Sequence, residues 1–535
     1  MAPTLEPAVR PSKPALEANA SAQLLDDIFA AYDRADAPGL AVGLALNGAV
    51  AYRRGFGLAQ AHQPSRLGPD TPMRIGSVSK HVLCLLLIQL VQEGRLSLDD
   101  SPRRHVPRLP PWADAMSLRQ LMNHSSGMRC SLDLLLQIGG LASEIPGQVQ
   151  LDLLCAQTDL NFTPGGGWCY SNGGYALLGH IAEQVAGYTF RTRAILKAQE
   201  RAGLEVRAIT GLRHTALCRR DADLAPGGAA SHLPAAGGGY ARSVFGPSIG
   251  GEGGVVSTVD DMLRWMAWMS ARWGTLCTAR APNGYGLGVY SGIYRGARII
   301  HHGGNVVGGN CLMLHLPDCA LDLILITNRG DLDAEALALR VVDACVGGLE
   351  PAAGGRTGAA LPDGAFHSPS SGAFLRLLTR QGLRYGQFHG TTLPLREDGA
   401  GALAVGRLGS DTRLTPVTED GAVTALHLSE CGRGERLQLL PPVDPSRIAT
   451  TVYGAYRCES PDVAATITPG NGSSQLRMQS PFGAMRYVLE SLGEDLCVAT
   501  TGDPLLPLGG LLEFDHAGFR FSSQRTRRLR FVRQP

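Results

Sequence analysis

An apolar segment from Val78 to Val91 is the feature that most constrains this chain, because its side chains are hydrophobic almost all round. A helix with that pattern has to be buried. The turn that opens it nevertheless carries two polar residues, Ser77 and Lys80. Residues three apart lie on the same face of a helix, so we expect the Lys80 amine to reach the Ser77 hydroxyl.

Lys80 is one of only three lysines in a chain of 535 residues that is otherwise rich in arginine. Arginine stays protonated, whereas a lysine in an apolar, cation-rich pocket can lose its proton and act as a general base. Serine needs such a base before its hydroxyl becomes a good nucleophile. The alternative interpretation is that Ser77 only caps the helix, which is a common role for serine.

Two further segments carry candidate motifs. A glycine-rich turn over residues 162–168 leads into Tyr170-Ser171-Asn172 and then into a helical pattern. Residues 298–305 predict a short apolar strand that ends in His301-His302-Gly303-Gly304, where glycine lets a backbone approach a ligand closely. Taken singly, each motif also fits a structural role, since tyrosine packs well at a turn and lone histidines are usually structural.

The order Ser-x-x-Lys, Tyr-x-Asn, His-x-Gly resembles the penicillin-recognising serine hydrolases, which comprise class C β-lactamases, DD-peptidases, related esterases and D-aminopeptidases. The resemblance runs through the first 345 residues and includes residues 96–100, 117–127, 253–265 and 285–288. It implies a serine β-lactamase/DD-peptidase-like α+β domain that works through an acyl-enzyme without a cofactor.

The resemblance also implies a role for each motif residue. Ser77 would be the nucleophile, Lys80 would take its proton and Tyr170 would relay a proton to the leaving group. Asn172 would hold Lys80 and the substrate amide. The oxyanion hole would consist of the backbone N–H groups of Ser77 and Asn305, beside Gly304.

His302 stands where β-lactamases and DD-peptidases carry the lysine of Lys-Thr-Gly or Lys-Ser-Gly, and His301 is its competitor in the alignment. Gly303-Gly304 fits the motif better when His302 comes first. A permanent lysine cation suits the carboxylate of penicillins, whereas histidine is only partly charged near neutral pH. This departure disfavours a β-lactamase.

A second serine motif is Gly246-Pro247-Ser248-Ile249-Gly250, which matches the nucleophile elbow of α/β-hydrolases. That motif requires a strand before it and a helix after it. Glycines at 237–239 and 251–254 predict a loop instead.

The hydrophobic pattern predicts one antiparallel sheet flanked by helices over residues 21–345, with a flexible tail at 1–20 and a helix capped by Ser21. A hairpin joins strands 40–46 and 49–56 at Asn47-Gly48. The composition of residues 346–364 predicts a linker. Short strands with regular turns then predict two small antiparallel β-barrels, at 365–447 and 448–535.

This arrangement resembles the bacterial D-aminopeptidases, in which the last barrel sends a loop into the catalytic cleft. The matching loop is expected at residues 479–486, around Pro481, Phe482 and Gly483. It contains no acidic residue to meet a substrate ammonium group, and Glu490 and Asp495 are the nearest substitutes.

Charge and composition exclude several classes of partner. The net charge of +2 argues against nucleic acid. The arginines at 525, 527, 528, 530 and 533 predict a final strand with one solvated face, with an anion site as the alternative. No run of about 18 apolar residues and no signal peptide are apparent, which favours a cytoplasmic location without membrane contact. The spacing of the twelve cysteines predicts neither a metal site nor a disulfide framework.

We therefore expect a serine hydrolase, an aminopeptidase or amidase that releases N-terminal D-amino acids such as D-alanine from a small peptide or amide. The alternatives are a β-lactamase-like esterase or DD-peptidase, and a catalytically silent binding protein with the same fold. A homodimer is one of the assemblies that the sequence leaves open.

Overall fold

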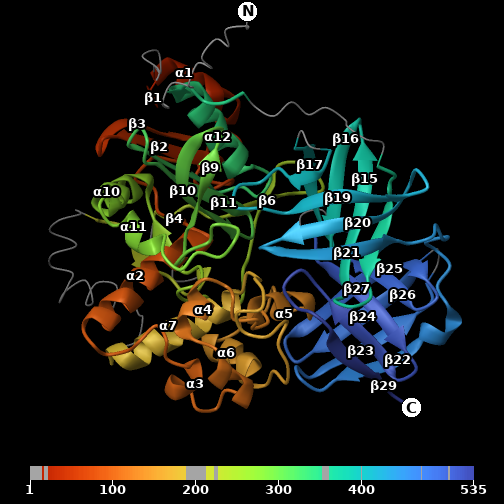
Figure 1. The fold of residues 1–535 in the computed structure, drawn as a ribbon. Coiled ribbons are helices and arrows are strands. Elements are labelled where there is room, and N and C mark those ends of the chain that lie inside the picture. Colours follow the sequence, from red (N-terminus) through yellow and green to blue (C-terminus); the bar gives the residue numbers. More distant parts are fainter. Residues whose placement is uncertain are drawn as a thin grey trace, which may run out of the picture.

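The computed structural model describes residues 15–16, 22–187, 212–221, 227–351, 361–398, 401–470, 473–503 and 506–535 (Figure 1). The predicted tail lies outside them, apart from strand β1 (Ala15–Leu16), which pairs with β13 (Val346–Gly347). The helix cap predicted at Ser21 and residues 352–360 of the predicted linker also lie outside the described residues.

A six-stranded antiparallel sheet forms the centre of the first part of the chain, in the order β3-β2-β12-β11-β10-β9. Its strands are β2 (Leu40–Leu46), β3 (Ala49–Phe56), β9 (Tyr290–Tyr294), β10 (Ala297–Val306), β11 (Gly309–Leu316) and β12 (Leu321–Thr327). The hairpin predicted at Asn47-Gly48 is confirmed with both of its strand boundaries.

Helices cover both faces of this sheet because its central strands are apolar on both sides. On one face, Leu323 and Leu325 pack with α1 (Ala22–Phe29) and α12 (Ala334–Cys345). On the other, Ile324 and Ile326 pack with α2 (Ser79–Gln92) and α10 (Val259–Met269). Alternate residues of a strand point to opposite faces, so one buried strand contributes to two cores.

A helical region lies below the sheet in Figure 1, where α7 (Asn172–Ala186) packs against α2, α4 and α6. The other helices and short strands of this part are α3 (Pro102–His105), α4 (Leu118–Met122), α5 (Ser131–Gln137), α6 (Gly147–Cys155), α11 (Trp273–Leu276), β4 (Met73–Arg74), β5 (Ala216–Leu217), β6 (His232–Pro234), β7 (Tyr240–Arg242) and β8 (Val255–Ser257).

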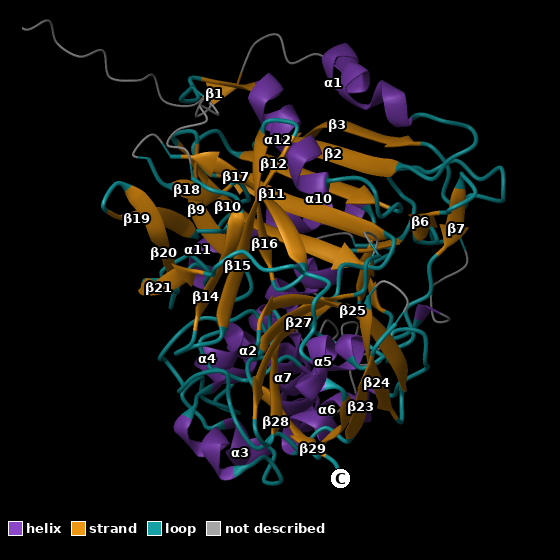
Figure 2. Ribbon diagram, turned by 90° about the vertical axis from the view of Figure 1, so that its right-hand side faces the viewer, coloured by secondary structure: helices purple, strands orange, loops and turns teal. Residues whose placement is uncertain are grey.

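Two closed antiparallel barrels of eight strands follow, and they face the viewer in Figure 2. The first contains β14 (Gly364–Ser368), β15 (Ala373–Arg380), β16 (Leu383–Phe388), β17 (Thr391–Glu397), β18 (Leu403–Val405), β19 (Arg413–Glu419), β20 (Ala422–Glu430) and β21 (Arg433–Leu439). The second contains β22 (Gly454–Cys458), β23 (Val463–Thr468), β24 (Ser474–Ser480), β25 (Gly483–Gly493), β26 (Leu496–Thr500), β27 (Gly509–Asp515), β28 (Gly518–Ser522) and β29 (Leu529–Arg533). The predicted α+β fold followed by two barrels is confirmed.

Two predicted boundaries differ from the structure in ways that matter for function. The strand predicted to end in His301-His302-Gly303-Gly304 continues as β10 through both glycines to Val306, since its pairing with β11 is unbroken there. The last strand begins only at Leu529, so Arg525 and Arg527 precede it in the turn after β28. The prediction that these two arginines lie on a solvated strand face is therefore wrong.

Candidate active site

The Ser77 hydroxyl is presented by a tight turn, not by a helix cap. Ser77 lies in the 3₁₀ turn Gly76–Val78 that precedes α2, and no side chain caps either element. Its Oγ instead accepts a hydrogen bond of 3.1 Å from Lys80 Nζ. The contact predicted from the three-residue spacing is present, and the capping interpretation is wrong.

Lys80 is fully buried and held by three acceptors. Its Nζ donates to Ser77 Oγ, to Asn172 Oδ1 at 2.8 Å and to the backbone carbonyl of Glu252. The pKa of Lys80 is lowered to about 7, mainly by burial; the nearby Glu252 opposes this shift, and the positive charge of Arg525 adds to it. A large fraction of the amine is therefore neutral near pH 7, as a general base requires.

Tyr170 lies directly over the amine, with Lys80 Nζ 4.9 Å from the centre of its ring. Burial raises the pKa of Tyr170, and the nearby Ser77 hydroxyl lowers it only in part. The phenol is therefore protonated at neutral pH and can donate its proton. Its buried hydroxyl has no hydrogen-bond partner among the described residues, which leaves it free to serve a substrate atom.

The start of α7 positions Asn172. Ser171 caps this helix by accepting a hydrogen bond from Gly174 N at 3.1 Å, so Asn172 is the first helical residue. The side chain at that position faces Lys80 of α2. The helical pattern predicted to follow Tyr170-Ser171-Asn172 therefore begins within that motif, and the two glycines after Asn172 conceal this first turn in the sequence.

Strand β10 approaches the Ser77 turn so closely that glycine is required. A Cβ on Gly304 would lie 2.0 Å from the carbonyl oxygen of Ile75, and a Cβ on Gly76 would lie 3.0 Å from the backbone N of Asn305. The backbones of Ser77 and Asn305 are thereby brought to the same small region. Both residues line the cavity described below.

His302 is a buried neutral residue of this strand. Its Nδ1 lies 2.6 Å from the Gly303 carbonyl, and its Nε2 lies 3.2 Å from the hydroxyl of Tyr285. A carbonyl only accepts, so Nδ1 carries the proton and Nε2 accepts from Tyr285. Burial, followed by the Lys80 charge, holds the pKa of His302 well below its usual value. His301 is instead stacked on Tyr290, with ring centres 5.2 Å apart.

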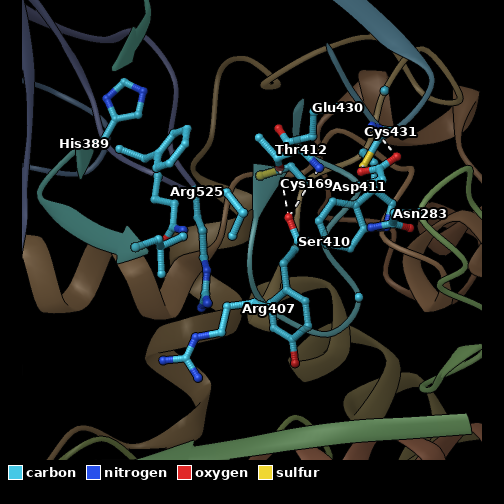
Figure 3. Close-up of a pocket in the computed structure, with 18 of the residues that line it drawn as sticks. Cys169, Asn283, His389, Arg407, Ser410, Asp411, Thr412, Glu430, Cys431 and Arg525 are labelled. Carbon is cyan, nitrogen blue, oxygen red and sulfur yellow. Dashed lines mark hydrogen bonds between the residues drawn. The ribbon is translucent and has the colours of Figure 1, made fainter. Parts of the chain in front are cut away.

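A cavity of about 580 Å³ opens over these groups. Ser77, Tyr170, Asn172, His302 and Asn305 line it from the catalytic domain, whereas Lys80 and Gly304 lie beneath its surface. The other wall comes from both barrels (Figure 3). The barrel residues labelled there are His389, Arg407, Ser410, Asp411, Thr412, Glu430, Cys431 and Arg525.

The first barrel reaches the cavity through residues 406–412, between β18 and β19. A Cβ on Gly409 would lie 2.7 Å from the ring of Tyr290, so this turn packs tightly on β9. Two hydrogen bonds join this turn to the end of β20: Thr412 Oγ1 donates to Glu430 at 2.8 Å, and Cys431 N donates to Asp411 at 2.9 Å. These hydrogen bonds fix two carboxylates at the cavity wall.

The loop predicted to enter the cleft from the second barrel lies elsewhere. Ser143 Oγ donates to the Phe482 carbonyl, and the Phe482 ring packs in the cluster that contains Leu135 and Ile145. Pro481, Phe482 and Gly483 are absent from the described residues that line the cavity. The second barrel contributes Gln524, Arg525 and Arg527 instead, from the turn before β29.

Two residues of the site, Glu252 and Tyr285, were not identified from the sequence as functional, and a third, Arg525, figures there only in the alternative of an anion site. Glu252 binds Lys80 through its carbonyl, and Tyr285 holds His302. The guanidinium carbon of Arg525 lies 4.9 Å from the centre of the Tyr170 ring. The sequence does offer a signal for Glu252, which is a lone acidic residue inside a glycine-rich loop. It offers no such signal for the contact of Arg525 with Tyr170, because Arg525 lies far from the motifs in the sequence.

Ser248 does not form a nucleophile elbow. It is buried in the irregular segment between β7 and β8, and its backbone bonds to Ile145. With neither a strand before it nor a helix after it, the predicted loop is confirmed.

Several other features bear on the site. Within the described ranges, no three His, Cys, Asp or Glu side chains form a group suited to a metal ion. The described helices include none with the length and hydrophobicity that a membrane crossing needs. All twelve cysteines are free thiols.

Comparisons with known proteins agree with this geometry. A family model described as Beta-lactamase matches residues 25–346. The chain is similar to the D-aminopeptidase of Brucella melitensis, with 25% identity over 481 residues that cover 86% of this chain and 87% of the relative.

Two solved structures share the fold. The octameric penicillin-binding protein homologue from Pyrococcus abyssi has a TM-score of 0.52 and 17% identity, over 85% of this chain and 96% of that one. The D-amino acid amidase from Ochrobactrum anthropi SV3 in complex with L-phenylalanine amide has a TM-score of 0.50 and 22% identity, over 60% and 97%.

Proposed function

This chain belongs to the β-lactamase family and is a serine hydrolase, and from that premise we propose that it is an aminopeptidase or amidase that releases N-terminal D-amino acids. One observation carries the proposal: Ser77 and the buried Lys80, whose pKa is lowered to about 7, form a hydrogen bond of 3.1 Å beside a protonated tyrosine. The similarity to a D-aminopeptidase extends over 86% of the chain and supports the substrate class.

The proposed reaction begins at Ser77. Neutral Lys80 takes the hydroxyl proton as Oγ attacks the substrate carbonyl, and the backbone N–H groups of Ser77 and Asn305 stabilise the oxyanion. Tyr170 then gives its proton to the leaving amine and takes the proton of Lys80 in return, which restores the neutral lysine. Water attacks the acyl-enzyme while Lys80 takes its proton and passes it to Ser77 Oγ, which frees the D-amino acid and regenerates the serine.

Asn172 and His302 act as positioning groups in this scheme. Asn172 fixes the Lys80 amine through its Oδ1, and the second end of its amide is available to the substrate. Neutral His302 lies 6.2 Å from Tyr170 between ring centres and supplies no permanent charge. This difference from the lysine of β-lactamases supports an amide or peptide substrate over a penicillin.

The ammonium group of the substrate needs an acidic partner, which the turn at Pro481 does not contain. We assign that role to the cavity wall of the first barrel, where Asp411 and Glu430 are held by hydrogen bonds.

The free cysteines support a reducing, cytoplasmic location.

The test compares D-alanine amide, L-alanine amide and p-nitrophenyl acetate as substrates of the full chain. Faster hydrolysis of D-alanine amide than of its L-enantiomer, abolished in Ser77→Ala, is the expected result. Hydrolysis of the ester alone would favour the esterase, and no Ser77-dependent reaction with any of them would favour the silent binding protein.

A further inference from the structure

The cavity contains a guanidinium group without a counter-ion. Arg525 lies in the turn between β28 and β29, and its guanidinium carbon is 4.9 Å from the centre of the Tyr170 ring. Among the described residues, this group has no hydrogen-bond or ion-pair partner. Two other cavity arginines are engaged, since Arg407 pairs with Asp333 at 2.7 Å and Arg527 bonds to His389. An unpaired charge in a partly enclosed site is costly, and an anionic ligand would remove that cost.

The backbone of the turn is fixed, so the guanidinium is held in place before any ligand binds. Ser523 Oγ and Thr526 Oγ1 both donate to Asp133 of α5, at 2.6 and 2.8 Å. The carbonyl of Arg525 accepts a hydrogen bond of 3.0 Å from Asn161. A cation that is positioned in advance binds an anion at a lower entropic cost.

The position of Arg525 places this charge on the leaving-group side of the scissile bond. In the proposed mechanism Tyr170 gives its proton to the leaving amine, and an α-carboxylate lies only two bonds from that nitrogen. Arg525 stacks on the ring of the same tyrosine (its place among the barrel residues is shown in Figure 3). His302 is neutral and offers no competing charge.

We propose that Arg525 binds a free α-carboxylate on the leaving group, so that the preferred substrates are dipeptides with an N-terminal D-residue. The inference rests on the proposed function and narrows its substrate class. A cavity of about 580 Å³ that both barrels close is of the size that holds small ligands. The planar guanidinium matches a carboxylate with two parallel hydrogen bonds.

The test measures kcat/KM for D-alanyl-glycine and for D-alanyl-glycinamide, which differ only in the terminal carboxylate. The wild-type full chain should prefer the acid. Arg525→Gln should lower kcat/KM for the acid by about 10–100-fold and leave the amide within about threefold, because only the acid loses a charge-assisted pair. Arg525→Lys should recover part of the preference, since it restores the charge without the planar fork.

Arg528→Gln is the matched control, because it removes one positive charge from the same turn. Arg528 contacts the Pro369 carbonyl and Glu513 outside the cavity and should leave both substrates unchanged. Circular dichroism of each variant checks the fold. If Arg525→Gln does not fold, the comparison of wild type with Arg525→Lys still tests carboxylate recognition. Lysine cannot form the two parallel hydrogen bonds of the guanidinium, so Arg525→Lys must prefer the acid less strongly than the wild type does.

The outcomes separate the two proposals. An equal loss of kcat/KM on the acid and the amide in the Arg525 variants would show that the residue acts through Lys80 or Tyr170. That result would overturn carboxylate recognition and leave the proposed function standing. Equal turnover of acid and amide by the wild type would do the same. Hydrolysis of p-nitrophenyl acetate with no reaction on either D-alanyl compound would overturn the proposed function, and this substrate class with it.

Discussion

At the scale of single residues, the site works because burial changes the chemistry of common side chains. Burial lowers the pKa of Lys80 to about 7 and raises the pKa of Tyr170, so the amine can lose its proton near neutral pH while the phenol keeps its own. The same burial makes His302 a neutral hydrogen-bond acceptor for Tyr285. One low-dielectric pocket therefore provides a base, an acid and a positioning group.

Ser77→Ala should lower kcat/KM for D-alanine amide by about 10³-fold or more, because no other hydroxyl among the described residues is bonded to the Lys80 amine. Ser248→Ala is the control, since Ser248 is a buried loop serine with a similar change in size. Steady-state kinetics on both variants, with melting temperatures, measure the effect. A larger loss in the control would return the elbow motif to consideration.

The pH dependence follows from the lowered pKa of Lys80. Its value falls from 10.5 to about 7, so the amine loses its proton as pH rises through that value, and kcat/KM should increase with pH and level off above about pH 8. Lys80→Arg cannot deprotonate and should lose about 10²–10⁴-fold across the range. A pH profile that is flat from 5 to 9 would contradict a neutral lysine base.

At the scale of elements, the site is the meeting point of one helix start, one turn and one strand. The turn of Ser77 and strand β10 are in contact along their backbones, with glycine at the closest points. Hydrogen bonding of β10 to β11 continues through this region and keeps it straight. The strand therefore acts as a rigid wall for the oxyanion position.

Gly304→Ala should destabilise the protein by about 1–3 kcal/mol, because its Cβ would lie 2.0 Å from the Ile75 carbonyl oxygen and force β10 away. Activity should fall as well, since the Asn305 N–H would move with the strand. The neighbouring Gly303→Ala is the stability control, because its Cβ would meet only the Cys311 carbonyl, at 3.8 Å. The midpoint of urea unfolding should be lower for Gly304→Ala than for Gly303→Ala, and similar midpoints would contradict the close approach of Gly304 to the Ile75 carbonyl.

At the scale of the whole molecule, the barrels complete a cavity that the catalytic domain leaves open. The first barrel supplies Asp411 and Glu430, and the second supplies Arg525. The second barrel is anchored to the helical region at several places, among them Asp133 of α5 and the turn at Phe482. The turn that binds Asp133 also carries Arg525 into the cavity, whereas the turn at Phe482 lies outside the described cavity lining.

Phe482→Ala should therefore reduce stability by about 1–3 kcal/mol without changing the ratio of activities on D-alanyl-glycine and D-alanyl-glycinamide. The ring is half-buried against the helical region and lies outside the cavity lining. Val488→Ala, on the exposed side of the strand β25 that follows Phe482, serves as the control, with little change in either quantity. A changed ratio of the two activities would show that the Phe482 turn contributes to substrate specificity.

The sequence by itself determined the features that depend on neighbours along the chain. The spacing of Ser77 and Lys80 fixed their contact within one helical turn, and the Asn47-Gly48 turn between two strand-length segments fixed the hairpin. Tertiary structure alone decided that Arg525 meets Tyr170, 355 residues earlier in the numbering, and that the Phe482 turn docks on Ser143. Local periodicity determines which face of an element is buried, but the partner of that face depends on how whole barrels pack, and no spacing within the chain encodes that packing directly.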